Sequence, residues 1–586
     1  MVRYLILAFA AGLLLLAPLF PAPLFSGQEA VAAAIPGTGI LDILQTELTR
    51  SMDNLSSASE IPLYYLQYAV TEQCSFNLSM SNGGFEAPHA MHERFLDVDL
   101  RVGSMDLDNT HEIRGGNWRD NYDGRRVIYF PLDNDPGSIA AALWSETEYQ
   151  YRKAQERYTK VLSNRQVMVE EEDLSNDFSP GEPHQFTEAI SIAQYDEKYW
   201  RDVIGLAGRY FASVPFVKES QVRFSVQDNA TYLVNSDGDR LQHGNHYHRL
   251  SLSIEGMAED GMVLNRSHYY AAAAITNFPD AETIMADAER LVTELELLIN
   301  APMVEPYIGP AILRHRASGV FFHEIFGHRI EGHRQKSESE GQTFTKKVGQ
   351  QILPEFISVY DDATLQQFNN DDLRGYYKFD DEGTPAERVT VVEKGVLKNF
   401  LTSRSPINNF PKSNGHGRRQ AGYDVVARQG NLVIESERRV PYSELRAMLI
   451  EECKRQNKPY GLIFDDISGG FTMTGRGGPQ AFKVNPLLVY RVHTDGRPDE
   501  VVRGVDIVGT PLTCFSKILM AAQDDAVFNG TCGAESGNVP VSAISPSLLV
   551  AEIEVEKRRK GQDRPPILPP PLLEGSKEES EGGEMP

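Results

Sequence analysis

One segment constrains the fold of this chain more than any other: ASGVFFHEIFGHRIEGH, which spans Ala317–His333. Ser318 is placed to cap a helix, and Val320 begins an apolar run that continues toward His323. His323 and His328 are five residues apart, which separates them by about 140° around a regular α-helix. Both rings can reach one ion only if the helix is kinked or widened, for example by a π-bulge. Gly327 weakens the helix at the position where this distortion is needed.

The residue types in this segment are those of a catalytic zinc site. Neutral imidazoles suit zinc, and a catalytic zinc keeps three protein ligands and a water. Glu324 directly follows His323 and is placed to take a proton from a zinc-bound water that attacks a peptide carbonyl. An HExxxH pattern also arises by chance in unrelated chains.

Length and charge limit the alternatives. A chain of 586 residues is too long for one ordinary domain, and 41% apolar residues predict a sizeable core. The net charge of -25 argues against nucleic acid as the main partner. No GxSxG pattern, Walker loop or dinucleotide-binding glycine pattern is present, so a serine hydrolase, nucleotide-dependent or redox function has no support.

The hydrophobic patterning predicts an α+β protein with two folded domains. Residues 36–300 are expected to form a mixed α/β domain, with a hairpin over residues 222–254 and a helix capped by Asp280. Residues 301–555 carry short strand-like runs between glycine-rich turns, which predicts a β-rich domain that contains the HExxxH helix.

Both ends of the chain have the composition of processing or disordered segments. Residues 1–34 carry a positive charge at Arg3 near their start, continue with an uncharged apolar run and end in small residues, as a secretory signal peptide does. We therefore expect an exported protein, periplasmic or extracellular, although a retained membrane anchor is the alternative. Residues 556–586 are basic, then proline-rich, then acidic, and are expected to be disordered.

Four further motifs, in order along the chain, resemble those of the TldD/PmbA family of metallopeptidases. They are FDDEGTPAE (379–387), SNGHGRR (413–419), VRGVDIVGTPL (502–512) and NGTCGAESGNVPV (529–541). The HExxxH segment is similar to that of the TldD branch of this family. The resemblance implies a zinc ion held by His323, His328 and Cys532, with Glu324 as the catalytic base. It also implies cleavage of flexible or unfolded peptides that bind as an added strand, in a homodimer or in a heterodimer with a family paralogue.

Several alternatives stay open at this stage. The chain could be a non-catalytic, peptide-binding subunit of such a complex, or it could hold a structural zinc. Cys532 could instead form a disulfide with Cys514, and His333 could join or replace a metal ligand. Four charged residues are candidates for binding the substrate, or alternatively for an ion pair or a solvated acidic turn: Arg418, Arg419, Asp381 and Glu382.

Overall fold

The computed structural model describes residues 38–115, 126–167, 172–476, 482–509 and 514–558. The predicted signal peptide lies outside the described residues, and so does the predicted tail beyond residue 558. Among the described helices, none combines the length and the apolar character that crossing a membrane requires.

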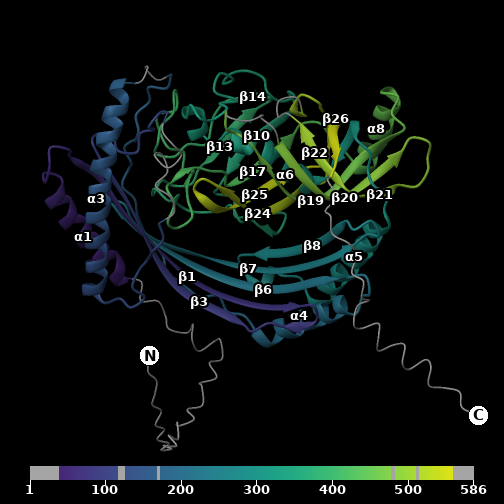
Figure 1. Ribbon diagram of the computed structural model, residues 1–586, viewed down its shortest axis with the longest axis horizontal. Coiled ribbons are helices and arrows are strands. Elements are labelled where there is room, and N and C mark those ends of the chain that lie inside the picture. The colour runs from purple at the N-terminus through teal and green to yellow at the C-terminus, as the bar shows by residue number, and fades with distance from the viewer. Residues whose placement is uncertain (1–37, 116–125, 168–171, 477–481, 510–513, 559–586) are drawn as a thin grey trace, which may run out of the picture.

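The N-terminal part is built on one long, curved sheet with the strand order β4-β3-β1-β6-β7-β5 (Figure 1). Strand β2 pairs with β1 and strand β8 pairs with β7. The strands are β1 (Leu63–Ser81), β2 (Gly84–Phe85), β3 (His89–Val102), β4 (Ile128–Tyr129), β5 (Gln185–Thr187), β6 (Glu219–Asn235), β7 (Arg240–Met257) and β8 (Val263–Ala272). The predicted hairpin is confirmed as β6 and β7, which pair antiparallel along nearly their whole length.

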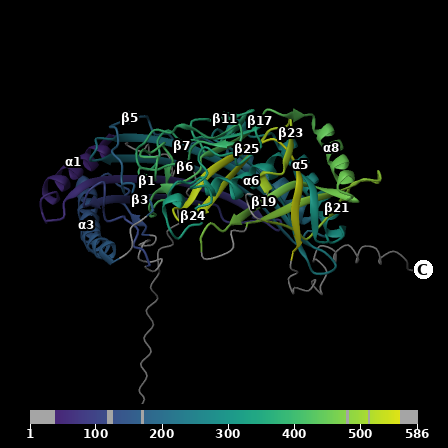
Figure 2. The same cartoon turned by 90° about the horizontal axis from the view of Figure 1, so that it is seen from above.

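Helices cover the convex face and one end of this sheet (Figures 1 and 2). Helix α4 (Glu197–Ala212) and helix α5 (Ala281–Asn300) pack their apolar faces on alternate residues of β6 and β7, such as Phe224 and Leu250. The predicted cap of α5 is confirmed, because the Asp280 carboxylate accepts a hydrogen bond from the amide of Thr283. The 3₁₀ turn η1 (Ile275–Asn277) precedes α5, and α1 (Thr38–Leu55) packs with α3 (Pro136–Val167) at the other end.

The C-terminal part lies over the concave face of the large sheet and consists mainly of two sheets (Figure 1). One has the order β14-β13-β10-β17-β25-β24; the other has the order β18-β23-β26-β22-β20-β19-β9, with β21 beside β20. Strands of the first are β10 (Ile357–Asp362), β13 (Arg388–Glu393), β14 (Val396–Leu397), β17 (Asn431–Ser436), β24 (Ala526–Ala534) and β25 (Gly537–Ser545). Strands of the second are β9 (Tyr307–Leu313), β18 (Arg439–Val440), β19 (Tyr460–Thr472), β20 (Phe482–His493), β21 (Glu500–Val502), β22 (Val505–Gly509), β23 (Ile518–Ala522) and β26 (Leu548–Lys557).

Helix α6 (His315–Ile325) packs against strands of both sheets, and its apolar side chains form the centre of the largest core cluster. The remaining elements are η2 (Gly327–Arg329), α7 (His333–Lys336), α8 (Tyr442–Arg455) and two short ribbons, β11 (Gln367–Phe368) with β12 (Asp371–Asp372) and β15 (Gly417–Arg418) with β16 (Val426–Ala427). The prediction of an α+β fold with a β-rich C-terminal region that carries the HExxxH helix is confirmed.

Ser318 does not cap α6, so that prediction is wrong. The helix begins at His315, three residues earlier, and Ser318 is buried within it. Its hydroxyl instead shares a hydrogen bond of 2.7 Å with the hydroxyl of Ser545 on β25. The polar side chain therefore fastens the helix to the sheet below it.

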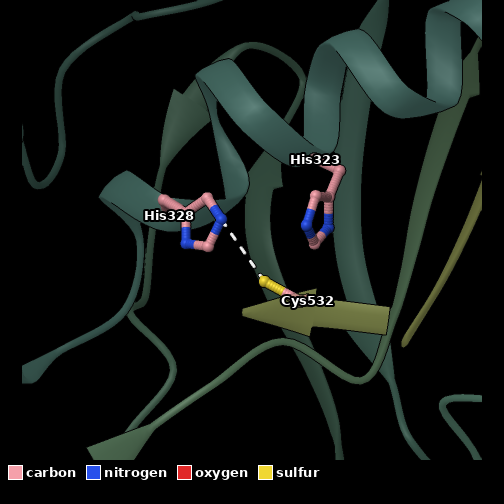
Figure 3. Close-up of side chains that lie close together, drawn as sticks. All are labelled: His323, His328 and Cys532. Atoms are coloured by element: carbon pink, nitrogen blue, oxygen red, sulfur yellow. Dashed lines mark hydrogen bonds between the residues drawn. The ribbon is translucent and has the colours of Figure 1, made fainter. Parts of the chain in front are cut away.

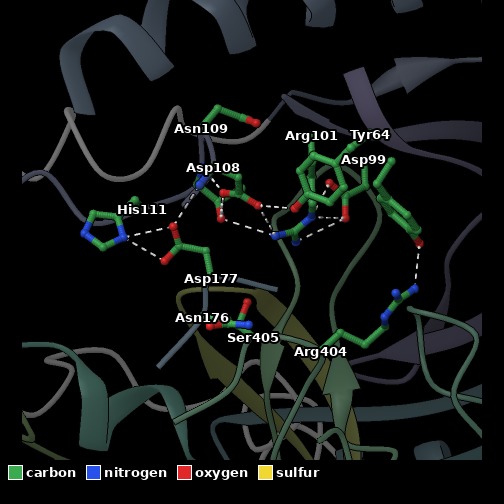
Figure 4. Close-up of polar contacts among 12 residues, drawn as sticks. Tyr64, Asp99, Arg101, Asp108, Asn109, His111, Asn176, Asp177, Arg404 and Ser405 are labelled. Atoms are coloured by element: carbon green, nitrogen blue, oxygen red, sulfur yellow. Dashed lines mark hydrogen bonds and ion pairs between the residues drawn. The ribbon is translucent and has the colours of Figure 1, made fainter. Parts of the chain in front are cut away.

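A buried polar network joins the two parts of the molecule (Figure 4). Arg404 of the C-terminal part donates hydrogen bonds to the carbonyl of Ser179 and to the carboxylate of Asp237, at 2.7 and 2.6 Å. Its guanidinium also lies 4.1 Å from the centre of the Phe178 ring. Nearby, the buried carboxylate of Asp108 accepts from Tyr64 and Arg101. The contacts of Arg404 fix the large sheet relative to the part that carries the HExxxH segment.

Candidate metal centre

The two histidines of the HExxxH segment lie on either side of a break in the helix. Helix α6 ends at Ile325, Phe326 is its last capping residue, and the chain continues as the 3₁₀ turn η2. His323 is therefore in the last turn of α6, and His328 is in the turn that follows. The predicted kink is present, but a π-type widening is not. The helix ends, and the tighter 3₁₀ turn places the ring of His328 near that of His323.

Gly327 permits this break mainly because it leaves room for the neighbouring side chain of Gln429. A Cβ at this position would lie 1.9 Å from Oε1 of Gln429, whose side chain is buried. A side chain at this position would require the buried Gln429 amide to move away from η2. Spacing along the sequence suggested a weak point at Gly327, but the approach to Gln429 depends on the tertiary fold.

Cys532 comes from β24 and meets the two rings although it is 204 residues from His328 (Figure 3). Its Sγ is 3.4 Å from Nε2 of His328, and the centres of the two imidazole rings are 5.2 Å apart. One donor atom from each of the three residues lies within 4.8 Å of the others. The structure thus brings together the three residues predicted as ligands.

The donor set fits a zinc ion. Imidazole nitrogens and thiolate sulfur are both zinc ligands, a catalytic zinc keeps three protein ligands, and all three side chains are at least nine-tenths buried. Nδ1 of His323 is buried without a hydrogen-bond partner in the described part of the protein. Native structures seldom leave such an atom unsatisfied, and a bound ion or water is the usual explanation.

The charges of the three groups favour a thiolate. Burial alone would raise the pKa of Cys532, but the adjacent His328 and His323 outweigh it and lower that pKa well below its usual value. Burial would likewise lower the pKa of His328, yet the thiolate of Cys532 and the carboxylate of Glu331 hold it well above the usual range. The thiolate is the form of cysteine that binds metals.

Glu331 orients His328, and sequence reasoning missed it. Its fully buried carboxylate lies 3.2 Å from Nδ1 of His328, which leaves Nε2 directed at Cys532. The carboxylate also accepts from Arg334 at 2.8 Å and pairs with Arg428. Arg428 in turn donates to the carbonyl oxygen of Cys532 at 2.8 Å. One signal was available: an acidic residue three positions after a candidate ligand can hold its ring in place.

Glu324 lies beside the three donor residues, next to His323 on α6. Glu324 is 9% exposed. Strand β19 passes close to it, since a Cβ on Gly470 would be 3.2 Å from Cγ of Glu324. A carboxylate in this position can accept a proton from a group close to an ion bound by the three donor residues.

His333 and Cys514 do not join the three donors. Nε2 of His333 is paired with the carboxylate of Glu535, which also accepts from Arg334 at 2.8 Å. Cys514 and Cys532 are both free thiols, so the structure contains no disulfide between them.

The four residues predicted to bind substrate are occupied by internal contacts. Arg418 donates to the carbonyls of Gln429 and Pro540, and Arg419 pairs with Asp97 of β3 at 2.8 Å. The carboxylate of Asp381 accepts from the amide of Arg419, and that of Glu382 accepts from the amide of Arg404. The acidic loop is not a solvated turn, because Asp380 and Glu382 are both buried. Substrate binding by these four residues stays a prediction.

Comparison with known proteins places the C-terminal part in one family. Residues 307–557 match the family model described as "PmbA/TldA metallopeptidase C-terminal domain". A metalloprotease of Archaeoglobus fulgidus is 31% identical over 265 residues, which cover 45% of this chain and 56% of the relative. A TldD homologue of Haemophilus influenzae, named a metalloprotease, is 26% identical over 44% of this chain and 51% of its own length. A zinc metalloprotease TldD homologue of Saccharolobus solfataricus is 23% identical over 47% and 57%.

The matched region thus spans about half the length of these relatives. Solved structures extend the likeness to most of the chain. TldE from Thermococcus kodakarensis has a TM-score of 0.58 and 15% identity, over 88% of this chain and 99% of that one. A protein of Thermotoga maritima has a TM-score of 0.58 and 17% identity, over 87% and 100%. At these identities the likeness shows a shared fold.

Proposed function

Since this chain belongs to the TldD/PmbA family, we propose that it is a zinc-dependent metallopeptidase that hydrolyses peptide bonds in flexible or unfolded peptides. The observation that carries the proposal is the convergence of His323, His328 and Cys532 beside Glu324. Relatives that share the C-terminal part are named metalloproteases, and one is named a zinc metalloprotease. These names support the reaction class and the metal.

Each residue of the centre has a separate task in this proposal. His323, His328 and Cys532 would hold the ion. When bound, zinc would acidify water and polarise the carbonyl of the substrate. A carboxylate oxygen of Glu324 would take the proton from the attacking water and deliver it to the leaving amine. Glu331 would keep Nδ1 of His328 protonated, so that Nε2 stays available to the ion.

The free edge of β24 suggests how a peptide binds. This strand is the last in its sheet, and within the described residues no strand pairs with its other edge. Figure 1 shows β24 next to the concave face of the large sheet, and Tyr269 of β8 donates a hydrogen bond to the carbonyl of Asn529 on β24. A peptide added along this edge would pass Cys532, with main-chain hydrogen bonds providing affinity and little sequence preference.

A non-catalytic, peptide-binding role is the competing function, and the site argues against it. A binding subunit needs neither the three donors nor a carboxylate next to them, whereas both are present here. We further propose that the mature protein is exported, to the periplasm or outside the cell, and that it works as a homodimer or with a family paralogue. These two statements rest on the apolar N-terminal run and on the family resemblance alone.

The test is digestion of unstructured synthetic peptides by the zinc-loaded protein and by the variant Glu324→Gln. The substitution keeps the size of the side chain and removes the base, so we expect the cleavage rate to fall by roughly 10²–10⁴-fold while the zinc content stays the same. The matched control is Glu355→Gln, which changes an exposed glutamate of the same domain and should cleave like the wild type.

Cleavage that does not depend on Glu324 would contradict the assigned base. Bound zinc without any cleavage would favour a structural zinc. A folded wild-type protein that binds peptides, but that neither binds zinc nor cleaves the peptides in a Glu324-dependent way, would favour the binding subunit.

A further inference from the structure

Three arginines gather around two tyrosines between the large sheet and β24. The guanidiniums of Arg249 on β7 and Arg316 on α6 lie 4.6 and 4.9 Å from the centre of the Tyr269 ring. The guanidinium of Arg374, which follows β12, lies 4.1 Å from the centre of the Tyr247 ring. Tyr247 and Arg249 are two residues apart on one strand and so face the same side of the sheet. We call Arg249, Arg316, Arg374, Tyr247 and Tyr269 the arginine cluster.

The arginine cluster lies on the concave side of the large sheet. Along β7, Tyr247 and Arg249 alternate with Leu250 and Leu252, which are buried under the helices of the convex face. Alternation therefore places both residues on the concave face, toward the C-terminal part. There the hydroxyl of Tyr269 donates a hydrogen bond to the carbonyl of Asn529 on β24, so the arginine cluster contacts the C-terminal part.

Two of the three guanidiniums have no carboxylate partner among the residues that the structure describes. Arg316 lies 3.5 Å from the carboxylate of Asp466. Within the described part of the chain, neither Arg249 nor Arg374 takes part in an ion pair, although the protein carries 25 more acidic than basic residues. Arg374 is also partly buried, and burial together with the like charges of Arg249 and Arg418 lowers its pKa. Positive charges that are gathered without a carboxylate partner raise the local concentration of anions.

The arginine cluster borders the strand that carries Cys532. Nη1 of Arg374 donates to the hydroxyl of Thr531 at 2.6 Å and to the carbonyl of Gly530 at 3.3 Å. Tyr269 bonds the carbonyl of Asn529. These three residues immediately precede Cys532, so a ligand held by the arginines lies alongside the route of a peptide past the metal centre.

We propose that Arg249 and Arg374 form a binding site for a carboxylate of the substrate, so that the preferred substrates are acidic peptides or peptides with a free C-terminus nearby. This inference rests on the proposed peptidase function and adds a substrate class to it. A guanidinium matches a carboxylate with two parallel hydrogen bonds, and the adjoining tyrosine rings keep the guanidinium planes in place. Arg419 is less suited to this task because Asp97 already neutralises it.

The experiment uses four versions of one unstructured peptide. One sequence carries glutamate and the other carries glutamine at the same positions, and each of these two sequences is made with a free and with an amidated C-terminus. With the zinc-loaded full chain, we expect kcat/KM for the favoured carboxylate-bearing peptides to exceed that of the glutamine peptide with an amidated end by about tenfold or more, as a charge-assisted hydrogen bond allows. Preference for glutamate identifies side-chain carboxylates as the source, and preference for the free end identifies the C-terminus.

Arg249→Gln should remove most of this preference, because the amide carries no charge to attract the carboxylate. Within the described part of the chain the Arg249 side chain contacts the Tyr269 ring and donates no hydrogen bond, so we expect the fold to tolerate the change. Arg249→Lys keeps the charge and should retain part of the preference. The matched control is Arg201→Gln on α4, where an arginine also lies over an aromatic ring, 5.2 Å from the centre of Phe85, but on the convex side of the sheet. This control should discriminate as the wild type does.

Equal kcat/KM for all four peptides would overturn the inference while leaving the peptidase function intact. An unchanged preference in Arg249→Gln would overturn it as well. If no peptide is cleaved, the proposed function fails separately, and binding of the same fluorescently labelled peptides decides the matter. Tighter binding of the carboxylate peptides by the wild type than by Arg249→Gln then supports the site, and equal binding refutes it.

Discussion

At the scale of single residues, Cys532 is the group on which the centre depends. It is 4% exposed, and its sulfur faces two imidazoles. His323, Glu324 and His328 could be predicted from local spacing, since a helix and the turn after it keep them together. Cys532 could not be predicted as a ligand from local spacing, because it is 204 residues from His328 along the chain. That prediction came from the family resemblance.

Cys532 should be the most reactive cysteine of the metal-free protein. Burial raises the pKa of each of the other three, Cys74, Cys453 and Cys514, to about 11, whereas the two imidazoles lower that of Cys532. At neutral pH only Cys532 is then a thiolate, which is the nucleophilic form. Mass spectrometry after brief alkylation with iodoacetamide should find the label on Cys532, and prior loading with zinc should prevent it. Equal labelling of Cys514 and Cys532 would contradict this.

Replacing Glu331 with glutamine should weaken zinc binding without removing a ligand. The amide cannot accept from Nδ1 of His328 with the strength of a carboxylate, and losses of about 10–100-fold in metal affinity are typical of such changes. Competition with a chromophoric chelator measures the affinity. Glu535→Gln is the control, since Glu535 also contacts Arg334 but pairs with His333 instead of His328. Equal affinities of the wild type and Glu331→Gln would show that Glu331 does not orient the ligand.

At the scale of elements, the end of α6 determines the geometry of the centre. The residue spacing predicted a distorted helix, and the structure has one, but local sequence did not distinguish a widened turn from an ended helix. That choice depends on Gln429, a residue 102 positions after Gly327 whose amide fills the space beside it. The start of α6 was misplaced for a similar reason, because Ser545 is the partner of Ser318 and lies on another element.

Gly327→Ala should therefore damage the centre. The added methyl group would overlap the Gln429 amide, and forcing extra volume into a packed core costs about 1–3 kcal/mol. We expect a lower midpoint of thermal unfolding and weaker zinc binding. Gly39→Ala is the control, because a Cβ at that position of α1 meets nothing within 4 Å. The double variant Gly327→Ala/Gln429→Ala should recover zinc binding; failure to recover would place the cause elsewhere.

At the scale of the whole molecule, polar contacts between the N-terminal and C-terminal parts hold the two parts together. The alternation of apolar residues was sufficient to predict the hairpin of β6 and β7 and the apolar face of α5. It could not predict that the large sheet would curve around the C-terminal part or that Arg404 would join them, since both depend on contacts between distant segments.

Arg404→Ala should destabilise the whole protein. Arg404 is 2% exposed, and its loss would leave Asp237 without its cation and the Ser179 carbonyl without its donor. Leaving a buried polar group without its hydrogen-bond partner costs about 1–3 kcal/mol. The midpoint of urea unfolding should fall accordingly, whereas Arg438→Ala, which changes an exposed arginine, should leave it nearly unchanged. A small effect at Arg404 would mean that the two parts are held by other contacts.

The most direct test of the account is X-ray absorption at the zinc edge, measured on the purified full-length protein. The account predicts one equivalent of zinc with two imidazole nitrogens and one sulfur at about 2.3 Å, and loss of the sulfur signal in Cys532→Ser. A folded protein that binds no zinc, or zinc surrounded only by oxygen and nitrogen in the wild type, would contradict it.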